Sequence, residues 1–300
     1  MKQVLDSSGI RLRDKSEKTV EILSWAVLVL FTLLALLPCL HVLSKSVSSG
    51  TDVTAGKIYF WPRHLQTETI RFIWTDTNFP TALKNSLIVT GLGTVISLLV
   101  TITTAYPLSK RNLRGMRFVS LLYVFSMVFY GGIVPAYMVV NSLGLIDTYW
   151  ALILPFAIVQ FNMFIVKNFF EALPDEIEES ARIDGAGDLR ILCSIVCPMA
   201  LPAIATVGLL YAVNYWNNYV HAMMYTRSTS MKTLQVFLYD ILANGSEVAM
   251  NVASGTAVTN LSSQNLVAGT VTLSAIPIIA LYPFVQRFLM KGLTIGSVKG

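Results

Sequence analysis

Residues 171–190 read EALPDEIEESARIDGAGDLR and lie between two stretches without Asp, Glu, Lys or Arg, residues 148–166 and 191–226. This segment, the polar island, holds seven acidic residues and two arginines, whereas only 13% of the 300 residues are charged. Because the flanking stretches are apolar enough to enter a bilayer, a charged segment between them is expected to contact something water-soluble. The apolar stretches therefore predict a membrane fold, and the island between them predicts where that fold contacts a soluble partner.

The composition predicts an integral membrane protein, because 54% of the residues are apolar and the mean hydropathy is +0.61. A bilayer core requires about 20 apolar residues per helix. The charge-free stretches predict an all-α membrane protein with six transmembrane helices near residues 22–43, 86–108, 118–140, 149–167, 202–225 and 266–287.

The net charge of +5 is compatible with nucleic-acid binding or with basic residues enriched in the cytoplasmic loops of a membrane protein. The placement of the basic residues favours the second explanation. Basic side chains gather in the N-terminal arm, in the loop after the second span and in the C-terminal tail, as expected for cytoplasmic segments. Both termini and the polar island are therefore predicted to be cytoplasmic, with no nucleic-acid partner. The loop at residues 44–84 carries five basic residues and is the weakest part of this topology.

Residues with catalytic or ion-coupling chemistry are missing from the predicted spans. None has Asp, Glu, Lys or Arg at its centre, where a charge costs about 2.5–3.5 kcal/mol, so an ion-coupled secondary carrier is disfavoured. No metalloprotease or nucleophile-elbow motif occurs, and Cys193 and Cys197 lack a second pair of ligands. We expect no catalytic residues, no metal site and no cofactor on this chain.

The island has the local pattern of a helix, a turn and a second helix. Pro174 suits the first turn, and the acidic residues that follow favour the positive end of a helix. Gly185 is expected to end that helix in the left-handed conformation, and Asp184 to cap the next one. Physical chemistry alone leaves two readings open: a docking element, or an acidic loop that only keeps the surface soluble.

A longer pattern within the island resembles a family signature. Residues 179–186 read ESARIDGA, and nine residues after Gly185 follow Ile195, Val196, Cys197 and Pro198. This spacing resembles the "EAA" signature of ABC importer permeases, with Ser180 and Cys197 as departures. The tail GLTIGSVKG (residues 292–300) and the Trp-Asn pair at 216–217 resemble maltose-type sugar permeases. Over residues 85–300 the likeness is greatest to the polysaccharide-type carbohydrate permeases of that group.

The resemblance implies a type I ABC importer permease fold in which the island is a cytoplasmic coupling helix. By their positions in the signature, the residues expected to couple the chain to the ATPase are Glu179, Ala181, Asp184 and Gly185. The tail residues Gly296, Lys299 and Gly300 are expected to contact the ATPase subunits. The division expected is an N-terminal arm (1–21), a first span with its extracellular loop (22–84), a permease core (85–290) and a tail (291–300).

The resemblance also implies the partners. They are a second, different permease chain, two ATP-binding subunits that hold ATP and Mg, an extracellular solute-binding lipoprotein and membrane lipid, in a bacterial cell membrane. The chain itself is then a transport subunit and not an enzyme, and it moves a sugar by alternating access. A permease for a non-sugar solute is the main alternative, and an ion-coupled carrier is the next.

Polar and aromatic residues cluster in the fifth predicted span. Amides and aromatic faces suit sugars, so the cluster is predicted to line a substrate path, with an interfacial aromatic belt as the alternative. The residues are Asn214, Tyr215, Trp216, Asn217 and Asn218. The small, polar loop at residues 227–265 resembles, in position, a loop of that family that probes the solute-binding protein and helps to release sugar, with a plain surface loop as the alternative.

Overall fold

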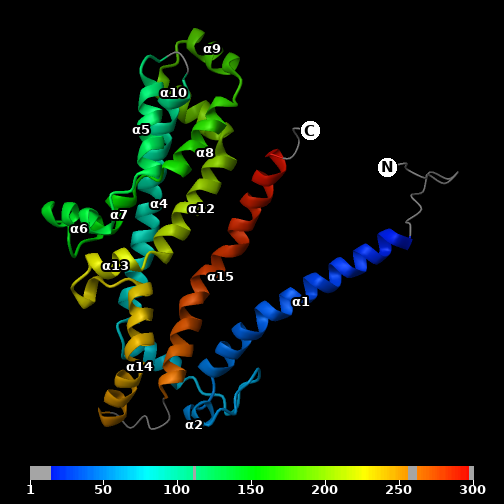
Figure 1. Cartoon of the computed structure of the whole chain (residues 1–300), viewed down its shortest axis with the longest axis vertical. Helices are drawn as coiled ribbons and strands as arrows, with labels where there is room; N and C mark the ends of the chain where they lie inside the picture. Colours follow the sequence, from blue (N-terminus) through cyan, green and yellow to red (C-terminus); the bar gives the residue numbers. More distant parts are fainter. Residues whose placement is uncertain (1–14, 111–112, 256–261, 297–300) are drawn as a thin grey trace. The chain divides into compact units, whose positions relative to one another are not determined.

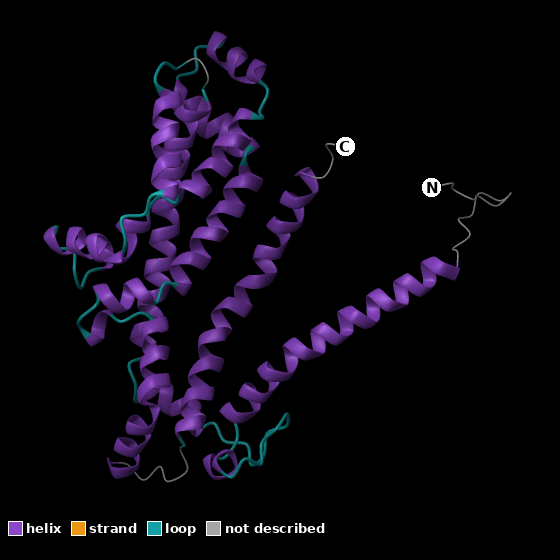
Figure 2. Ribbon diagram, viewed as in Figure 1, coloured by secondary structure: helices purple, strands orange, loops and turns teal. Residues whose placement is uncertain are grey.

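The computed structural model describes residues 15–110, 113–255 and 262–296. All regular structure within these residues is helical, with no strand among them (Figure 2). The chain forms two compact units, residues 1–70 with 245–272, and residues 71–244 with 273–300. Each unit is described separately below.

The described helices provide three membrane spans, or six if each of three bent helix pairs counts as one span. The continuous spans lie within α1 (Lys15–Ser46), α4 (Phe79–Ser109) and α15 (Ser263–Gly296). All three were predicted, and six is also the number that the sequence predicts. The other three predicted spans were expected to be continuous, and the structure breaks each of them.

The third predicted span is two helices, α5 (Met116–Val128) and α6 (Ile133–Ser142), bent by 114°. Gly132 between them has a φ of +95°, a backbone conformation that L side chains rarely adopt. The prediction of one continuous helix over 118–140 was wrong, because the chain leaves the helical conformation at Phe129 and takes a positive φ at Gly132.

The fourth and fifth predicted spans are broken as well. Pro155 lies in a short 3₁₀ turn between α7 and α8, which are bent by 51°. The fifth span ends early, because Asn218 leaves the helical conformation with ψ 86°. A further bend of 84° precedes α12. The helices are α7 (Tyr149–Ile153), η1 (Leu154–Phe156), α8 (Gln160–Glu171), α10 (Asp188–Ile191), the π-helical turn η2 (Leu192–Val196), α11 (Cys197–Met199), α12 (Leu201–Asn217) and α13 (Val220–Tyr225).

The loop predicted at residues 227–265 contains structure that the sequence did not suggest. A 3₁₀ turn, η3 (Thr229–Met231), is followed by α14 (Leu234–Gly255), which bends at Asn244. Among the described residues of this loop, 227–228, 232–233 and 262 are irregular, so the prediction of a loop was wrong over most of its described length. The remaining helices are α2 (Gly50–Thr54), α3 (Glu68–Thr75) and α9 (Asp175–Ile183).

The core of the larger unit is the packing of α4, α8 and α12 against one another (Figure 1). Two tyrosines of α12 cross this core. Tyr211 Oη lies 2.7 Å from Thr101 Oγ1 and accepts the Val159 N–H at 3.0 Å. Tyr215 Oη lies 2.9 Å from Ser97 Oγ and donates to the Ile153 carbonyl at 3.1 Å. Because both tyrosines are buried, these bonds fix α12 to α4 and to the broken fourth span.

The smaller unit is organised around one end of α1. Side chains of α1 are exposed all round from Ile22 to Leu40, as expected for a helix in lipid. Its last turn is covered by residues 47–67 and by the start of α15. Asn265 of α15 is buried there and donates to the carbonyls of Lys45 and Ser48 at 3.0 and 2.8 Å.

Candidate functional site at the polar island

The island folds as a helix, a turn and a second helix, as predicted. α9 begins directly after Pro174, and its first turn is acidic. Gly185 follows its end with a φ of +79°, which confirms the left-handed turn. The prediction that Asp184 caps the next helix was wrong, because Asp184 ends α9 and Gly187 precedes α10 without a side-chain cap.

Glycine is favoured at position 185 by backbone conformation and not by crowding. A Cβ built on Gly185 meets no atom within 4 Å, so the turn has room for a side chain. A non-glycine residue in the left-handed region costs about 1–2 kcal/mol. The geometry of the turn, which sets the angle between α9 and α10, therefore depends on this residue.

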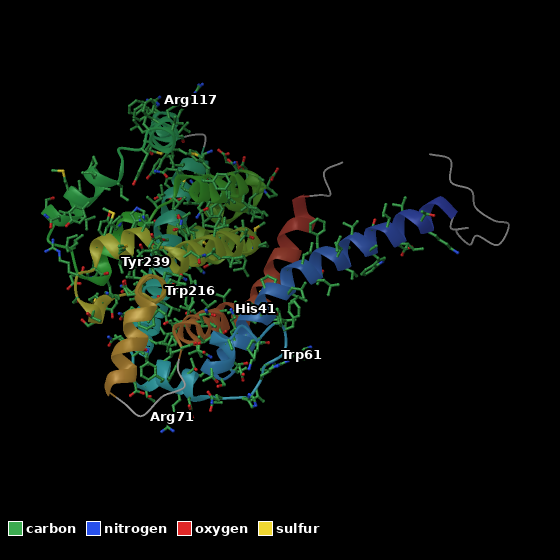
Figure 3. The ribbon with its side chains drawn as sticks, turned by 60° about the horizontal axis from the view of Figure 1, so that its bottom comes forward. His41, Trp61, Arg71, Arg117, Trp216 and Tyr239 are labelled. Carbon is green, nitrogen blue, oxygen red and sulfur yellow. The ribbon has the colours of Figure 1, made fainter. Side chains whose placement is uncertain are left out.

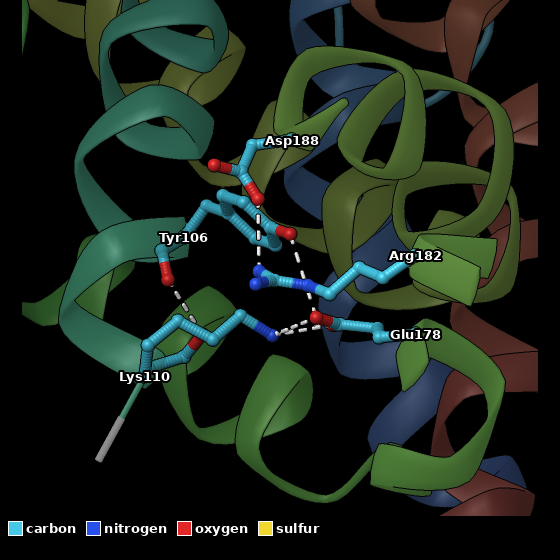
Figure 4. A network of polar contacts seen from close by, with 6 residues as sticks. Tyr106, Lys110, Glu178, Arg182 and Asp188 are labelled. Carbon is cyan, nitrogen blue, oxygen red and sulfur yellow. Dashed lines mark hydrogen bonds and ion pairs between the residues drawn. The ribbon is translucent and has the colours of Figure 1, made fainter. Parts of the chain in front are cut away.

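An ion pair ties α9 to the end of α4 (Figure 4). Lys110, directly after α4, donates through Nζ to both carboxylate oxygens of Glu178. Tyr106 donates its hydroxyl to Glu178 Oε2 at 3.4 Å, and the Lys110 ammonium lies 4.7 Å from the centroid of the Tyr106 ring. The side chains of Lys110 and Glu178 are 21% and 13% exposed, so the pair stays partly accessible to water.

A second ion pair bridges the turn itself. Arg182 of α9 donates through Nη2 to Asp188 Oδ1 of α10 at 2.8 Å, and both side chains are mostly exposed. The Ala186 N–H donates to the Ala181 carbonyl at 2.9 Å, which closes the turn from the backbone side. Together these contacts keep α9 and α10 as one small body.

The tip of the island presents apolar side chains outward. Ile183 is 87% exposed and Leu189 is 77% exposed, on either side of the turn. Among the predicted coupling residues, Glu179, Asp184 and Gly185 are exposed, whereas Ala181 is buried. The sequence analysis missed Ile183 and Leu189, although two apolar residues within a charged segment are a signal that was available.

The five predicted path residues do not share one face. Asn214 and Asn217 are exposed on α12, whereas Tyr215 and Trp216 are buried (Figure 3 labels Trp216). Asn218 lies in the break after α12, where its Oδ1 is 3.0 Å from His221 Nδ1. Consecutive helical residues point about 100° apart because a turn holds 3.6 residues. The run therefore does not present one face, and its role in lining a substrate path stays a prediction, with Asn214 and Asn217 as its exposed members.

The predicted tail residues lie at the limit of the described chain. Gly296 is the last residue of α15. Lys299 and Gly300 lie outside the described residues.

At the far end of the larger unit, residues 226–234 are held against two other elements, and we call them the clamp segment. Asp147 Oδ1 accepts the N–H groups of Arg227 and Ser228 at 2.9 and 3.0 Å, and these bonds lower the pKa of Asp147. Buried Asn85 of α4 donates to the carbonyls of Ser230 and Lys232 at 2.8 and 2.9 Å. The clamp segment is thus fixed through its backbone.

Comparison with known proteins places this architecture in a family. The model of the family described as "Binding-protein-dependent transport system inner membrane component" matches residues 20–295. The polygalacturonan/rhamnogalacturonan transport system permease protein YtcP of Bacillus subtilis (strain 168) is 39% identical over 93% of this chain and 98% of its own length. Protein LplC of the same strain is 38% identical over 89% of this chain and 90% of its own length.

A solved structure shows the same fold. It is described as a bacterial ABC transporter involved in the import of the acidic polysaccharide alginate. Its chain is 33% identical, with a TM-score of 0.85 over 93% of this chain and 99% of that one. This multi-pass membrane protein therefore belongs to the family of inner membrane components of binding-protein-dependent transport systems, and it is an ABC transporter permease subunit.

Proposed function

We propose that this chain is one half of the membrane pathway of an ATP-driven importer for an oligosaccharide or polysaccharide. The observation that carries the substrate class is that YtcP and the alginate transporter, similar over nine-tenths of the chain, are both described with polysaccharides. The chain itself performs no chemistry on the sugar. It alternates between inward-open and outward-open states with a second, different permease subunit.

The tip of the island is the docking site for a separate ATPase subunit. Ile183 and Leu189 are exposed apolar side chains on a charged, cytoplasmic element, and burying one such side chain contributes about 1.5–3 kcal/mol. Glu179 and Asp184 add negative charge beside them, which suits a cleft that carries basic residues. Two such subunits hold ATP and Mg, and no cofactor is bound by this chain.

Movement of the docked island passes to α4 through Lys110 and Glu178. Since α4 carries Ser97 and Thr101, which contact the tyrosines of α12, a shift of its end reaches the centre of the unit. α9 also continues through the chain into α8, which packs on α4. ATPase closure thereby biases the equilibrium between the two open states.

The same proposal assigns the two faces of the membrane. The termini and the island are cytoplasmic, and the clamp segment faces a solute-binding lipoprotein outside the cell. Asn214 and Asn217 offer amide donors and acceptors to the sugar hydroxyls.

Reconstitution tests the proposal. Vesicles that hold this chain with its second permease, ATPase subunits and binding protein should take up an oligogalacturonide only with ATP. Ile183→Asp should abolish uptake by disrupting docking, whereas Glu176→Gln, at an exposed position of α9, should leave it unchanged. Uptake driven by an ion gradient without ATP, or of an amino acid in place of the sugar, would contradict the proposal.

A further inference from the structure

Three consecutive aromatic residues of the smaller unit are exposed, although they belong to an ordered segment. Tyr59 is 70% exposed, Phe60 44% and Trp61 84%, while the preceding Ile58 is buried. Leu65, nearby in the same segment, is exposed as well. Large apolar side chains gathered on one exposed segment mark a surface that meets a partner or a membrane.

The aromatic run is tied to the end of α1 through its backbone. His41 Nδ1 donates to the Tyr59 carbonyl at 2.6 Å, and Ser44 Oγ donates to the Phe60 carbonyl at 2.6 Å. Because the carbonyls point to α1, the run is held beside the last two turns of that helix with its side chains free to project outward. Figure 3 shows Trp61 on the outside of this segment, with His41 on the helix.

The depth of the run follows from the length of α1. Residues 22–40 are exposed on all sides, and 19 residues at 1.5 Å per residue extend about 28 Å, close to the thickness of a bilayer core of about 30 Å. His41 and Ser44 therefore lie where the hydrocarbon gives way to the headgroups. Tyr59 and Phe60, bonded to these two residues, lie at the same level.

The chemistry of the run suits that level. Trp and Tyr favour the membrane interface because their rings are apolar and carry one polar group. Lys57 and Arg63 are exposed close to the run in the sequence, and their cationic groups match lipid phosphates. Because Tyr59 and Phe60 are hydrogen-bonded through their carbonyls to His41 and Ser44, the run lies beside the exposed surface of α1, where the same lipid can cover it.

We propose that Tyr59, Phe60 and Trp61 form an interfacial foot that inserts into the lipid headgroup region beside the end of α1. The foot holds the depth and tilt of α1, a helix with no side chain buried in the chain from residue 22 to residue 40. This inference requires that α1 crosses the membrane, and it is independent of the substrate and of the ATPase docking site. The solute-binding protein and the second permease are the competing partners for this aromatic surface.

The test measures lipid contact directly. A Trp61→Cys variant, in a chain with Cys39, Cys193 and Cys197 replaced by alanine, is labelled with a fluorophore and reconstituted in the complete importer. Lipids that carry a nitroxide at the headgroup or deep in the acyl chain then quench the fluorophore, and iodide quenches it from water. Ala55→Cys, exposed in the same loop between Thr54 and Gly56, is the matched control.

We expect headgroup nitroxide to quench the Trp61 probe at least threefold more than the Ala55 probe, and more than the acyl-chain nitroxide does. Iodide should quench the Ala55 probe more strongly. Equal quenching of both probes by iodide would overturn the proposal, and so would a Trp61 probe shielded from both lipid and iodide, because a protein partner then covers it. Tyr59→Cys provides the same readout if the Trp61 variant does not assemble.

Discussion

The two ends of α4 are held by different kinds of contact. At the clamp end, Asn85 and Ser86 bind backbone groups, the carbonyls of Ser230 and Lys232 and the N–H of Leu234. At the island end, the contacts are between side chains, above all the pair Lys110 and Glu178. The clamp contacts use short, buried side chains with few rotamers, whereas the long charged side chains at the island end have many.

The difference indicates which end moves. A displacement of the clamp segment breaks buried hydrogen bonds at once, and each unsatisfied buried group costs about 1–3 kcal/mol. At the island end, we expect the long side chains of Lys110 and Glu178 to stay paired when α9 moves, so that the end of α4 follows at a lower cost. We therefore expect the clamp end to be the fixed reference and the island end the adjustable one, which suits the proposed docking of an ATPase at the island.

Asn85→Ala should produce the largest effect and break the clamp end. Besides its two donor bonds, Asn85 Oδ1 accepts the Tyr149 hydroxyl at 2.7 Å, so the variant orphans three partners. We expect the free energy of unfolding to fall by about 3 kcal/mol, seen as a lower melting temperature in a fluorescence scan of the purified protein. Lys84→Ala, at the exposed neighbouring position, is the control. Equal melting temperatures for Asn85→Ala and the parent would show that the clamp is not rigid.

Gly93→Ala should be next, and it tests whether the core between the two ends is stiff. A Cβ at Gly93 would lie 2.7 Å from Tyr215 Cζ, and the Tyr215 ring is fixed by its own hydrogen bonds. Such overpacking costs about 1–3 kcal/mol. A Cβ at Gly91 meets nothing within 4 Å, so Gly91→Ala should be neutral or slightly stabilising. Similar melting temperatures for the two variants would mean that α12 is free to move away from α4.

Asp147→Ala should loosen the clamp segment by a smaller amount, because Asp147 is only partly buried. The pKa of Asp147 is lowered first by the Ser228 N–H and next by the Arg227 N–H. A lowered pKa means that the stabilisation is complete above the ordinary value of 3.8 and is lost as the pH falls through the lower folded value. The backbone amides of residues 227–228 should thus exchange hydrogen faster in the variant at pH 7. In the parent, titration of Asp147 should not change the protection of these amides between pH 5 and 8. A pH-dependent loss of protection near pH 6 would assign the clamp to another group.

The sequence predicts local features of this molecule better than the contacts between distant segments. Hydropathy locates the spans, and the left-handed turn at Gly185 follows from its place after an amphipathic helix. The broken third span does not follow, because a glycine pair in a membrane helix serves either close packing or unwinding, and at Gly132 the chain is out of the helical conformation. Gly93, with the same local sequence signal, packs closely against Tyr215.

The candidate site shows the same limit. The sequence identifies the island, but Lys110 precedes Glu178 by 68 residues, and nothing in either segment predicts that they pair. Likewise the run at 214–218 has the composition of a polar lining, yet Tyr215 is directed to Ser97 and the Ile153 carbonyl across the core. Which face of a helix is buried depends on its neighbours, and these are set by the whole fold.

Lys110→Gln sharpens the comparison with the smallest effect on stability and the most specific effect on function. The pair contributes at most about 1 kcal/mol, as is usual for ion pairs with partial exposure, so the melting temperature should hardly change. In the reconstituted importer, we expect ATP hydrolysis to continue while sugar uptake per ATP falls several-fold, because α9 then moves without α4. The exchanged pair Lys110→Glu with Glu178→Lys should restore the ratio.

Lys232→Gln is the matched control for this variant, because Lys232 also forms an ion pair, with Asp240 Oδ2 at 2.6 Å, but at the clamp end. Its uptake per ATP should equal that of the parent. If Lys110→Gln and Lys232→Gln leave the ratio equally unchanged, α9 drives the spans through the covalent connection to α8 alone. If both lower it, the clamp end takes part in the movement and is not the fixed reference. If only Lys110→Gln lowers uptake per ATP and the exchanged pair restores it, a direct contact between α9 and α4 transmits the movement. Only such a contact depends on the sign of both charges.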